Sequence, residues 1–367
     1  MGLFADLYHG ETNFDFPKWW RRALIFSAVL IVVSVLALVG RGLNLGIDFE
    51  GGTSWDVATD ASVADARDVL RPFGEAEAKI QVVEGNSLRI QSAVDDPAEV
   101  AEITAALGTI GEVQGTHSVG PSWGNEITKK AVRALVVFFV LLALFMAWRL
   151  EWKMAAAAIV AVVHDIIISV GVYAIFQIPV TPATVVSFLT ILGYSLYDTI
   201  VVFDKVLELT SRPAIVSRYT YTDIVSHGLN RVLMRSLNTT ILGVLPVVAM
   251  LIVGQFLGAE TLLDFAVALL VGMVVGAYSS IFIAAPVLAW LKEREPRHRT
   301  VRERLERGTD TGARHRPSSI TSGDLVGAVP GKKAPATVTA GPSPDASTPR
   351  PAPTGSIPPR PRKKKRR

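Results

Sequence analysis

The chain has 367 residues, half of them hydrophobic, and a formal net charge of +4. Its mean hydropathy of +0.36 is typical of an integral membrane protein and argues against a wholly soluble one. Cysteine is absent, which excludes disulfides, thiolate metal sites and cysteine nucleophiles. Residues 44–126 hold 15 acids and 4 bases, whereas residues 291–367 hold 19 bases and 7 acids. Charge of opposite sign is expected on opposite sides of a membrane.

The first predicted span, at 19–40, holds an apolar run at 23–39 that follows a polar segment (1–18) and the basic residues Lys18, Arg21 and Arg22. A secretory signal peptide has a shorter apolar core followed by a small-residue cleavage site, so an uncleaved anchor with a cytoplasmic N-terminus is favoured. Five more spans bring the C-terminus back to the cytoplasmic side. They are predicted at about 129–149, 153–176, 182–204, 236–254 and 262–290, with a cytoplasmic loop at 205–235.

The charges of the loops agree with this topology. The short loops assigned to the cytoplasm are basic, and the two tight outer turns carry no Lys or Arg, as the positive-inside rule requires. Lys129, Lys130 and Arg133 are an exception, because they begin the second span on the outer side. Long side chains of this kind can extend to the lipid headgroups.

Between the first two spans, residues 41–126 form a segment of soluble character. Predicted strands and helices follow in the order β-α-β-β-α-β, which indicates a small α+β, ferredoxin-like extracytoplasmic domain. Ser62 and Asp96 are predicted N-caps of its two helices. The domain has no cofactor motif; composition alone favours a solvated folding unit, and the alternative is a docking surface for a polypeptide or partner. The strands are predicted at 53–58, 79–83, 88–92 and 113–119, and the helices at 62–73 and 96–107.

Beyond the last span, residues 291–367 are rich in Pro, Ser, Thr, Gly and Ala and end in a basic run. Such a segment cannot bury a core, so a disordered cytoplasmic tail is predicted. Its charge could contact anionic lipid or ribosomal RNA, and a solvated tail explains it equally well.

Two acids stand within apolar spans and are the main candidates for chemistry. Asp165 lies near the middle of the third span beside His164, a possible proton relay, and Asp198 lies in the inner half of the fourth. An acid inside a span is costly and usually marks an ion or proton pathway. A structural hydrogen bond between helices is the alternative for Asp165. Asp204 is nearer the interface and is predicted to be a solvated group with Lys205.

The fifth span begins with Arg235-Ser236-Leu237-Asn238-Thr239-Thr240, which is too polar to face lipid. Arg235 is either one more positive-inside residue or a partner that releases Asp198 when that acid is protonated. In the sixth span, Gly272 and Gly276 form a small-xxx-small packing motif. The sequence holds no Walker A motif, nucleophile elbow or metal-spaced His cluster, so enzymatic activity, a metal site and a cofactor are not expected.

Four motifs of this chain resemble the SecF family of bacterial protein-translocase subunits, which is similar to half of an RND-type transporter. The resemblance covers roughly residues 18–293. The motifs are Gly46-Ile47-Asp48-Phe49-Glu50-Gly51-Gly52-Thr53, Val163-His164-Asp165, the span-four run from Gly193 to Lys205, and Met234-Arg235-Ser236-Leu237-Asn238-Thr239-Thr240.

The resemblance implies a proton-coupling role for Asp198 and Arg235, and it matches Asp165 to the family's His-Asp pair. Tyr197 stands where the family usually has Asn, which leaves the adjacent acid in register. His164, Asp204 and Asn238 are possible supporting residues, and Gly46, Asp48, Phe49, Gly51 and Gly52 form the family motif.

The resemblance also implies partners. Expected are SecD, the SecYEG channel, the translocating polypeptide, protons and, indirectly, SecA, in the cytoplasmic membrane and without a specific nucleic acid. The function it implies is proton-driven assistance to polypeptide export after insertion by SecA. Two alternatives stay open: an RND-like small-molecule transporter subunit, and a non-catalytic stabiliser of SecD.

Overall fold

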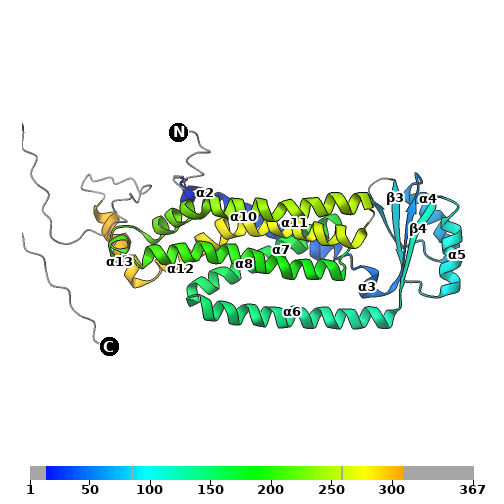
Figure 1. Cartoon of the computed structure of the whole chain (residues 1–367), viewed down its shortest axis with the longest axis horizontal. Helices are drawn as coiled ribbons and strands as arrows, with labels where there is room; N and C mark the ends of the chain where they lie inside the picture. The colour runs from blue at the N-terminus through cyan, green and yellow to red at the C-terminus, as the bar shows by residue number, and fades with distance from the viewer. Residues whose placement is uncertain (1–13, 84–85, 258, 309–367) are drawn as a thin grey trace, which may run out of the picture. The chain divides into compact units, whose positions relative to one another are not determined.

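The computed structural model describes residues 14–83, 86–257 and 259–308. Within this part of the chain, six helices are long and apolar enough to cross a membrane, which agrees with the six predicted spans. They run side by side along the long axis of Figure 1. They are α2 (Phe16–Arg41), α6 (Pro121–Arg149), α7 (Trp152–Phe176), α8 (Pro182–Thr210), α10 (Tyr221–Leu257) and a sixth made of α11 (Glu260–Ser279), a π-helical segment (Ser280–Ala284) and α12 (Ala285–Glu293).

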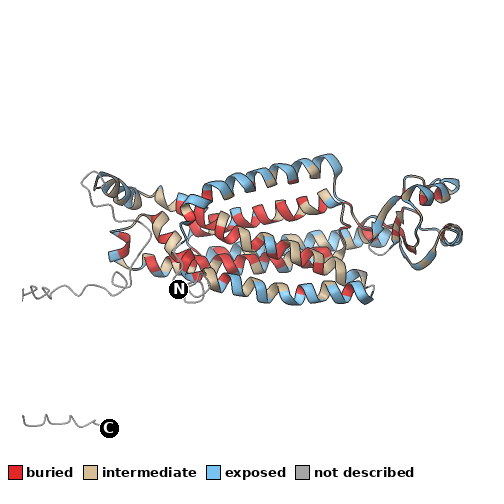
Figure 2. Cartoon of the chain, turned by 90° about the horizontal axis from the view of Figure 1, so that it is seen from above, coloured by how far each residue is buried: buried red, intermediate tan, exposed pale blue. Residues whose placement is uncertain are grey.

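The six helices divide into an inner and an outer group. About half of the most apolar window is buried in α7 (50%), α8 (44%) and the sixth helix (50%), against 11% in α2, α6 and α10. Figure 2 shows this contrast as buried residues in the middle of the bundle and exposed residues along its outside. Polar side chains on the three inner helices are therefore shielded from lipid and must find partners within the protein.

Small residues allow the inner helices to approach closely. A Cβ added to Gly272 of α11 would lie 2.4 Å from Ile191 Cδ1 of α8, and one added to Gly276 would lie 2.7 Å from Ser195 Cβ. The predicted packing face at these two glycines is confirmed. Similarly, a Cβ on Gly171 of α7 would lie 2.1 Å from Ser34 of α2. Without a hydrophobic driving force in lipid, contacts of this kind hold the bundle together.

Between α2 and α6 the chain forms a small domain with one antiparallel sheet, in the strand order β2-β3-β1-β4. A single apolar core joins strand residues such as Trp55 and Ile90 to helix residues such as Leu70 and Ile103. The elements are β1 (Gly52–Ala58), α4 (Val63–Leu70), a 3-10 turn (Arg71–Phe73), β2 (Lys79–Val83), β3 (Ser87–Ser92), α5 (Pro97–Leu107) and β4 (Glu112–Val119).

The two helices of this domain begin at the predicted caps. The hydroxyl of Ser62 accepts from the Asp65 amide, and the Asp65 carboxylate accepts in return from the Ser62 amide, which completes a capping box. The Asp96 carboxylate accepts from the amides of Ala98 and Glu99. Both N-cap predictions are confirmed, because capping depends on residues within one helical turn.

A short helix, α3 (Ile47–Glu50), connects α2 to the sheet. Gly51 and Gly52 follow it with φ angles of +84° and +106°, a region that side chains other than glycine rarely adopt. A Cβ on Gly52 would also lie 2.1 Å from the Ser92 carbonyl oxygen. Gly46 donates its amide to the Val180 carbonyl at 2.9 Å, which ties this connection to the turn between α7 and α8.

The segment 205–235, predicted as a loop, is mostly helical. Helix α8 continues to Thr210, a short α9 (Pro213–Val216) follows, and α10 begins at Tyr221. The predicted tail also begins with structure, because α13 (Pro296–Gly308) follows α12. Residues 309–367 and 1–13 lie outside the described residues, so the predictions for them concern parts of the chain that the structure does not describe.

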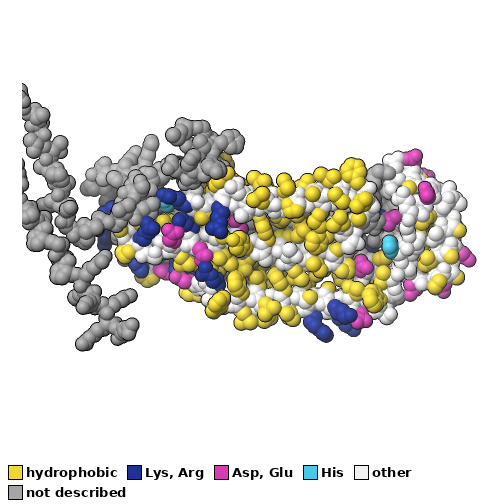
Figure 3. Space-filling view, in the orientation of Figure 1, with side chains coloured by type: hydrophobic (Ala, Val, Ile, Leu, Met, Phe, Trp, Pro, Cys, Tyr) yellow, Lys and Arg dark blue, Asp and Glu magenta, His cyan; other side chains and the backbone are white. Residues whose placement is uncertain are grey.

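Charged and apolar side chains occupy different zones along the length of the molecule. Figure 3 shows a hydrophobic band over the helices, with Lys and Arg gathered near α12 and α13 and acids prominent on the sheet domain. The Lys130–Glu126 ion pair, at 2.8 Å, lies on α6 and belongs to the basic exception noted in the sequence. The band is what a bilayer would cover.

Candidate functional site: two intramembrane acids

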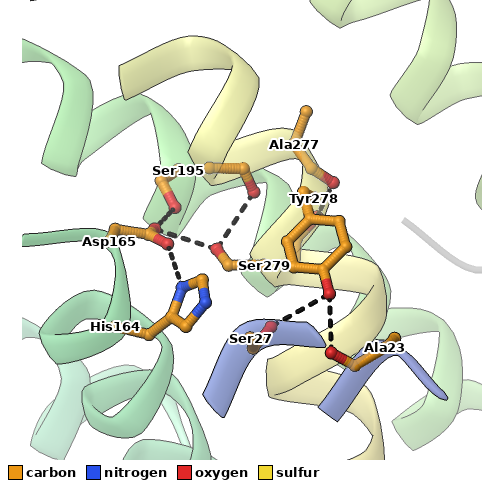
Figure 4. Close-up of polar contacts among 10 residues, drawn as sticks. Ala23, Ser27, His164, Asp165, Ser195, Ala277, Tyr278 and Ser279 are labelled. Atoms are coloured by element: carbon orange, nitrogen blue, oxygen red, sulfur yellow. Dashed lines mark hydrogen bonds and ion pairs between the residues drawn. The ribbon is translucent and has the colours of Figure 1, made fainter. Parts of the chain in front are cut away.

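Asp165 is enclosed by polar groups from three helices. The residue lies in α7 and is 2% exposed. Its Oδ2 accepts hydrogen bonds from Ser195 Oγ of α8 at 2.6 Å and from Ser279 Oγ of α11 at 2.9 Å, as Figure 4 shows. Its Oδ1 lies 3.1 Å from Nδ1 of His164. The acid therefore belongs to the interior of the bundle.

His164 extends the polar cluster toward α2. Its ring is buried and stacks on the ring of Tyr278, with centroids 6.1 Å apart. The Tyr278 hydroxyl donates to the Ala23 carbonyl at 2.9 Å and lies 2.9 Å from Ser27 Oγ (Figure 4). Neighbours on a helix point about 100° apart, yet His164 and Asp165 share one cluster here because the Nδ1 of the imidazole turns back to the carboxylate.

Asp198 has a similar environment of hydroxyl groups. The residue lies in α8 and is 6% exposed. Its Oδ2 accepts from Ser236 Oγ of α10 at 2.8 Å and from Ser280 Oγ of the π segment at 2.6 Å. A hydroxyl can donate to an ionised carboxylate and can accept from a protonated one. These partners can therefore satisfy Asp198 in either protonation state.

The structure does not bring Arg235 to Asp198. Arg235 lies on the exposed side of α10 and donates from Nη2 to the Tyr197 hydroxyl at 3.4 Å. Ser236, its neighbour in the chain, makes the contact with the acid instead. Tyr197 is 54% exposed, and Asn238 is exposed as well. Arg235, Tyr197 and Asn238 thus share an uncovered face of α8 and α10.

Gly193 also belongs to this uncovered face. Among the described residues, no atom lies within 4 Å of a Cβ built on Gly193, although Gly193 and Tyr197 lie four residues apart on one face of the helix. The opposite side of α8 carries Asp198 and Ser195 and is buried. Helix α8 therefore has one face packed within this chain and one face that is open.

Asp204 has a different partner from the one the sequence predicted. Its carboxylate accepts both contacts of an ion pair with Arg149 Nη2, at 2.9 Å and 3.1 Å, whereas Lys205 pairs with Glu208. The partner was missed because Arg149 lies 55 residues away, at the end of α6. Both side chains of the Asp204 pair are more than 40% exposed, so the contact fixes the α6 end only weakly.

The family motif after the first span forms the connection between α2 and the sheet domain. Gly46, Gly51 and Gly52 fit positions of close approach or positive φ, and Phe49 packs against the apolar cluster that includes Tyr173, near the C-terminal end of α7. Asp48 is half-buried; burial raises the pKa of its carboxyl, and His117 opposes that change. Among the described residues, no group of His, Cys, Asp and Glu could hold a metal ion.

Sequence reasoning missed the hydroxyl partners of both acids, above all Ser279 and Ser280. A signal was present, because two adjacent serines in an apolar span are expected to face partners rather than lipid. Ser195 and Ser236 lie in motifs that the sequence did single out. Which acid each hydroxyl reaches depends on how four helices pack, and this cannot be obtained from one sequence.

Comparison with known proteins identifies the family. Residues 99–294, more than half of the chain, match the model of "Protein export membrane protein SecD/SecF, C-terminal", and residues 36–63 match that of the "SecD/SecF GG Motif". The SecF protein translocase subunit of Streptomyces coelicolor is 41% identical over 332 residues, covering 88% of each chain. The chain belongs to the SecF family.

Other SecF proteins give the same result. The SecF of Mycobacterium tuberculosis strain H37Rv is 38% identical over 330 residues, covering 85% of this chain and 74% of that one. Among solved structures, SecDF from Thermus thermophilus, described as a translocon-associated membrane protein, aligns with a TM-score of 0.70 and 29% identity. That alignment covers 80% of this SecF chain and 40% of the SecDF chain, so this chain spans less than half of the solved one.

Proposed function

We propose that this chain is the SecF subunit of the Sec translocase and that, together with SecD, it uses proton motive force to promote polypeptide export after SecA has driven insertion at the SecYEG channel. The observation that carries the proposal is Asp198, a buried acid in a span whose carboxylate is held by hydroxyls from α10 and the π segment. Such an acid can gain and lose a proton without losing its partners.

Two findings support SecD as the partner. The alignment with SecDF leaves 60% of that chain unmatched, which is room for a second half. The open face of α8 and α10 carries Gly193, Tyr197, Arg235 and Asn238, which are polar or small and exposed within the chain. Lipid is a poor neighbour for an arginine and an asparagine, so we infer that SecD helices cover this face and that Arg235 acts there.

We also propose the finer features of the architecture. The strand order β2-β3-β1-β4 and the two intervening helices support a ferredoxin-like class for the small domain. The acidic surface of that domain and the basic residues near α12 support an extracytoplasmic domain and cytoplasmic termini in the bacterial inner membrane. The domain then offers a surface for SecD or for the emerging polypeptide.

The test is gradient-driven export of a reporter protein in inverted vesicles. Asp198→Asn keeps the size of the side chain and removes its proton exchange, so we expect loss of the dependence on the gradient at equal SecD association. Asp204→Asn is the matched control: its acid lies six residues along the same helix, is partly exposed and pairs with Arg149. That variant should retain at least half of the wild-type dependence.

The outcomes separate the alternatives. Loss of gradient-dependent export in Asp198→Asn, with Asp204→Asn active, supports the proton-coupled subunit. Normal export by Asp198→Asn would contradict coupling and leave a non-catalytic stabiliser of SecD. Purification without any SecD, combined with gradient-dependent release of small molecules from the vesicles, would instead identify a small-molecule transporter subunit.

A further inference from the structure

Two consecutive serines contact the two intramembrane acids. Ser279 Oγ donates to Asp165 of α7 at 2.9 Å, and Ser280 Oγ donates to Asp198 of α8 at 2.6 Å. Both serines are fully buried. Adjacent residues on a helix point about 100° apart, so one position of the sixth helix can reach both inner helices. Ser279 and Ser280 form a serine pair.

Each hydroxyl of the serine pair has a second acceptor within reach. Ser279 Oγ lies 3.2 Å from the Gly276 carbonyl, and Ser280 Oγ lies 3.1 Å from the Ala277 carbonyl. A serine hydroxyl has one hydrogen, so it is shared or directed to one of the two acceptors. Rotation about the side-chain bond moves that hydrogen between the acid and the helix backbone without breaking a covalent bond.

The serine pair lies where the helix changes its hydrogen-bonding pattern. Helix α11 ends at Ser279, and Ser280 is the first residue of the π segment. Single-turn π segments inside α-helices are uncommon and are frequent at functional sites. The preceding residue, Tyr278, is hydrogen-bonded to α2. Three consecutive residues therefore connect this turn to α2, α7 and α8.

We propose that the serine pair couples the two acids, so that a proton bound at one acid changes the hydrogen bonding and proton affinity of the other. This proposal rests on the proposed function. An ionised carboxylate binds a hydroxyl roughly twice as strongly as a neutral group does. When Asp198 takes up a proton, the Ser280 hydroxyl turns its hydrogen to the Ala277 carbonyl and accepts from the acid with its oxygen. The shared turn then shifts, and the contact of Ser279 with Asp165 changes.

Other titratable and charged groups lie near the two acids and stay unchanged in the test. His164 contacts Asp165, and Tyr278 stacks on His164. On the other side of α8, Arg235 contacts Tyr197, the neighbour of Asp198 in the chain. All of these groups are retained in the variants below, so a change confined to the serine variants reports on the hydroxyls.

The experiment measures Asp165 directly by infrared spectroscopy of the purified complex with SecD, titrated with pH. The band of interest is the carboxyl band that Asp165→Asn removes. In the wild-type background we expect Asp198→Asn to shift its titration midpoint by about 1 unit, the scale of coupled sites. In Ser280→Ala, and separately in Ser279→Ala, the same Asp198→Asn change should shift the midpoint by less than a third as much.

Ser187→Ala is the matched control. Ser187 is fully buried on α8 and donates across the same helix pair, to the Phe265 carbonyl of α11 at 3.0 Å, but it is bonded to neither acid. The full shift should therefore remain in that background. An undiminished shift in both serine variants, or no shift in the wild type, would overturn the proposal, because coupling would then be direct electrostatics or absent.

The result is distinguishable from failure of the proposed function. The infrared midpoints do not depend on export, whereas the vesicle assay does not resolve which acid is protonated. If Asp198→Asn exports normally while the midpoints behave as expected, the serine pair couples two acids that do not drive export. If Asp198→Asn leaves the titration midpoint of Asp165 unchanged and export still fails in that variant, Asp198 acts without Asp165.

Discussion

At the residue scale, hydroxyl groups from neighbouring helices surround both acids, and Asp165 also contacts the ring of His164. Ser195 and Ser279 hold Asp165, and Ser236 and Ser280 hold Asp198. An ion pair would stabilise a single charge state, whereas a hydroxyl accommodates two. The sequence identified the acids, because a carboxylate in an apolar run stands out locally. It could not identify their partners, because these come from other helices.

The tyrosines near the site provide a test of individual hydrogen bonds. Tyr278 makes contacts to Ala23 and Ser27, whereas the buried Tyr194 hydroxyl has no hydrogen-bond partner among the described residues. We expect Tyr278→Phe to lower the free energy of unfolding by about 1–2 kcal/mol. Tyr194→Phe should leave it unchanged or raise it, because the change removes a buried hydroxyl without a partner. Denaturant titration in detergent measures both, and equal losses would contradict the contacts.

Two carboxyls outside the membrane-spanning helices, those of Asp48 and Asp65, should change stability with pH in opposite directions. Burial raises the pKa of Asp48 above its ordinary value of 3.8. Asp48 therefore contributes fully to stability below pH 3.8, and this contribution is lost as the pH rises through the pKa of the folded state. We expect Asp48→Asn to increase amide protection of β1 at neutral pH, measured by hydrogen exchange, and to flatten its dependence on acidity.

Asp65 is the control for that measurement. Hydrogen bonds from Ser62 hold the pKa of Asp65 below its ordinary value of 3.8. Asp65 therefore contributes to stability above pH 3.8, and this contribution is lost as the pH falls through the pKa of the folded state. Asp65→Asn should decrease protection of α4 at neutral pH. The same sign of change in both variants would contradict these assignments.

At the scale of single elements, residues close together in the sequence predict the helices and where they begin. Contacts between distant residues determine the features that were not predicted. The spans, the caps at Ser62 and Asp96 and the hairpin strands depend on nearby residues. The π segment and the length of α10 were not predicted. Polar residues in 205–235 read as a loop, but α10 begins at Tyr221 because residues such as Ile224 and Val225 are buried there.

Gly276 is the element-scale test, because it sets the distance between α8 and α11 beside Asp165. A Cβ would lie 2.7 Å from Ser195 Cβ, so Gly276→Ala forces the helices apart and should cost about 1–3 kcal/mol. Gly40→Ala is the control, because Gly40 in α2 has open space around it in the described residues and alanine favours a helix. Equal unfolding midpoints for the two variants would contradict the close packing.

At the scale of the whole molecule, the core of six apolar helices and the inserted sheet domain could be predicted from hydropathy, charge and the turn and capping residues between the strands. The open face of α8 and α10 could not be predicted, because it is defined by what the other helices leave uncovered. A contact between Asp198 and Arg235, one of the two alternatives that the sequence left open, depended on that same packing, and Arg235 lies on the open side. A single chain therefore contains one half of an arrangement that the proposed partner would complete.

Gly193 tests whether SecD covers that face. The glycine has open space within the chain, so Gly193→Phe should leave the isolated chain folded, with a change in unfolding free energy below about 0.5 kcal/mol. Co-purification with SecD should fall at least tenfold, because a bulky side chain would prevent close helix contact. Gly193→Ala is the graded control and should retain most of the association. Full association of Gly193→Phe would place the interface elsewhere.

The length of α10 has a structural consequence. With 37 residues, the helix is about 55 Å long at 1.5 Å per residue, roughly 25 Å more than the apolar thickness of a bilayer. The part of α10 that precedes Ser236 is about 22 Å long, and its residues Tyr221, Ile224 and Val225 are buried. The helix therefore reaches from the serine that contacts Asp198 to residues well beyond the apolar layer.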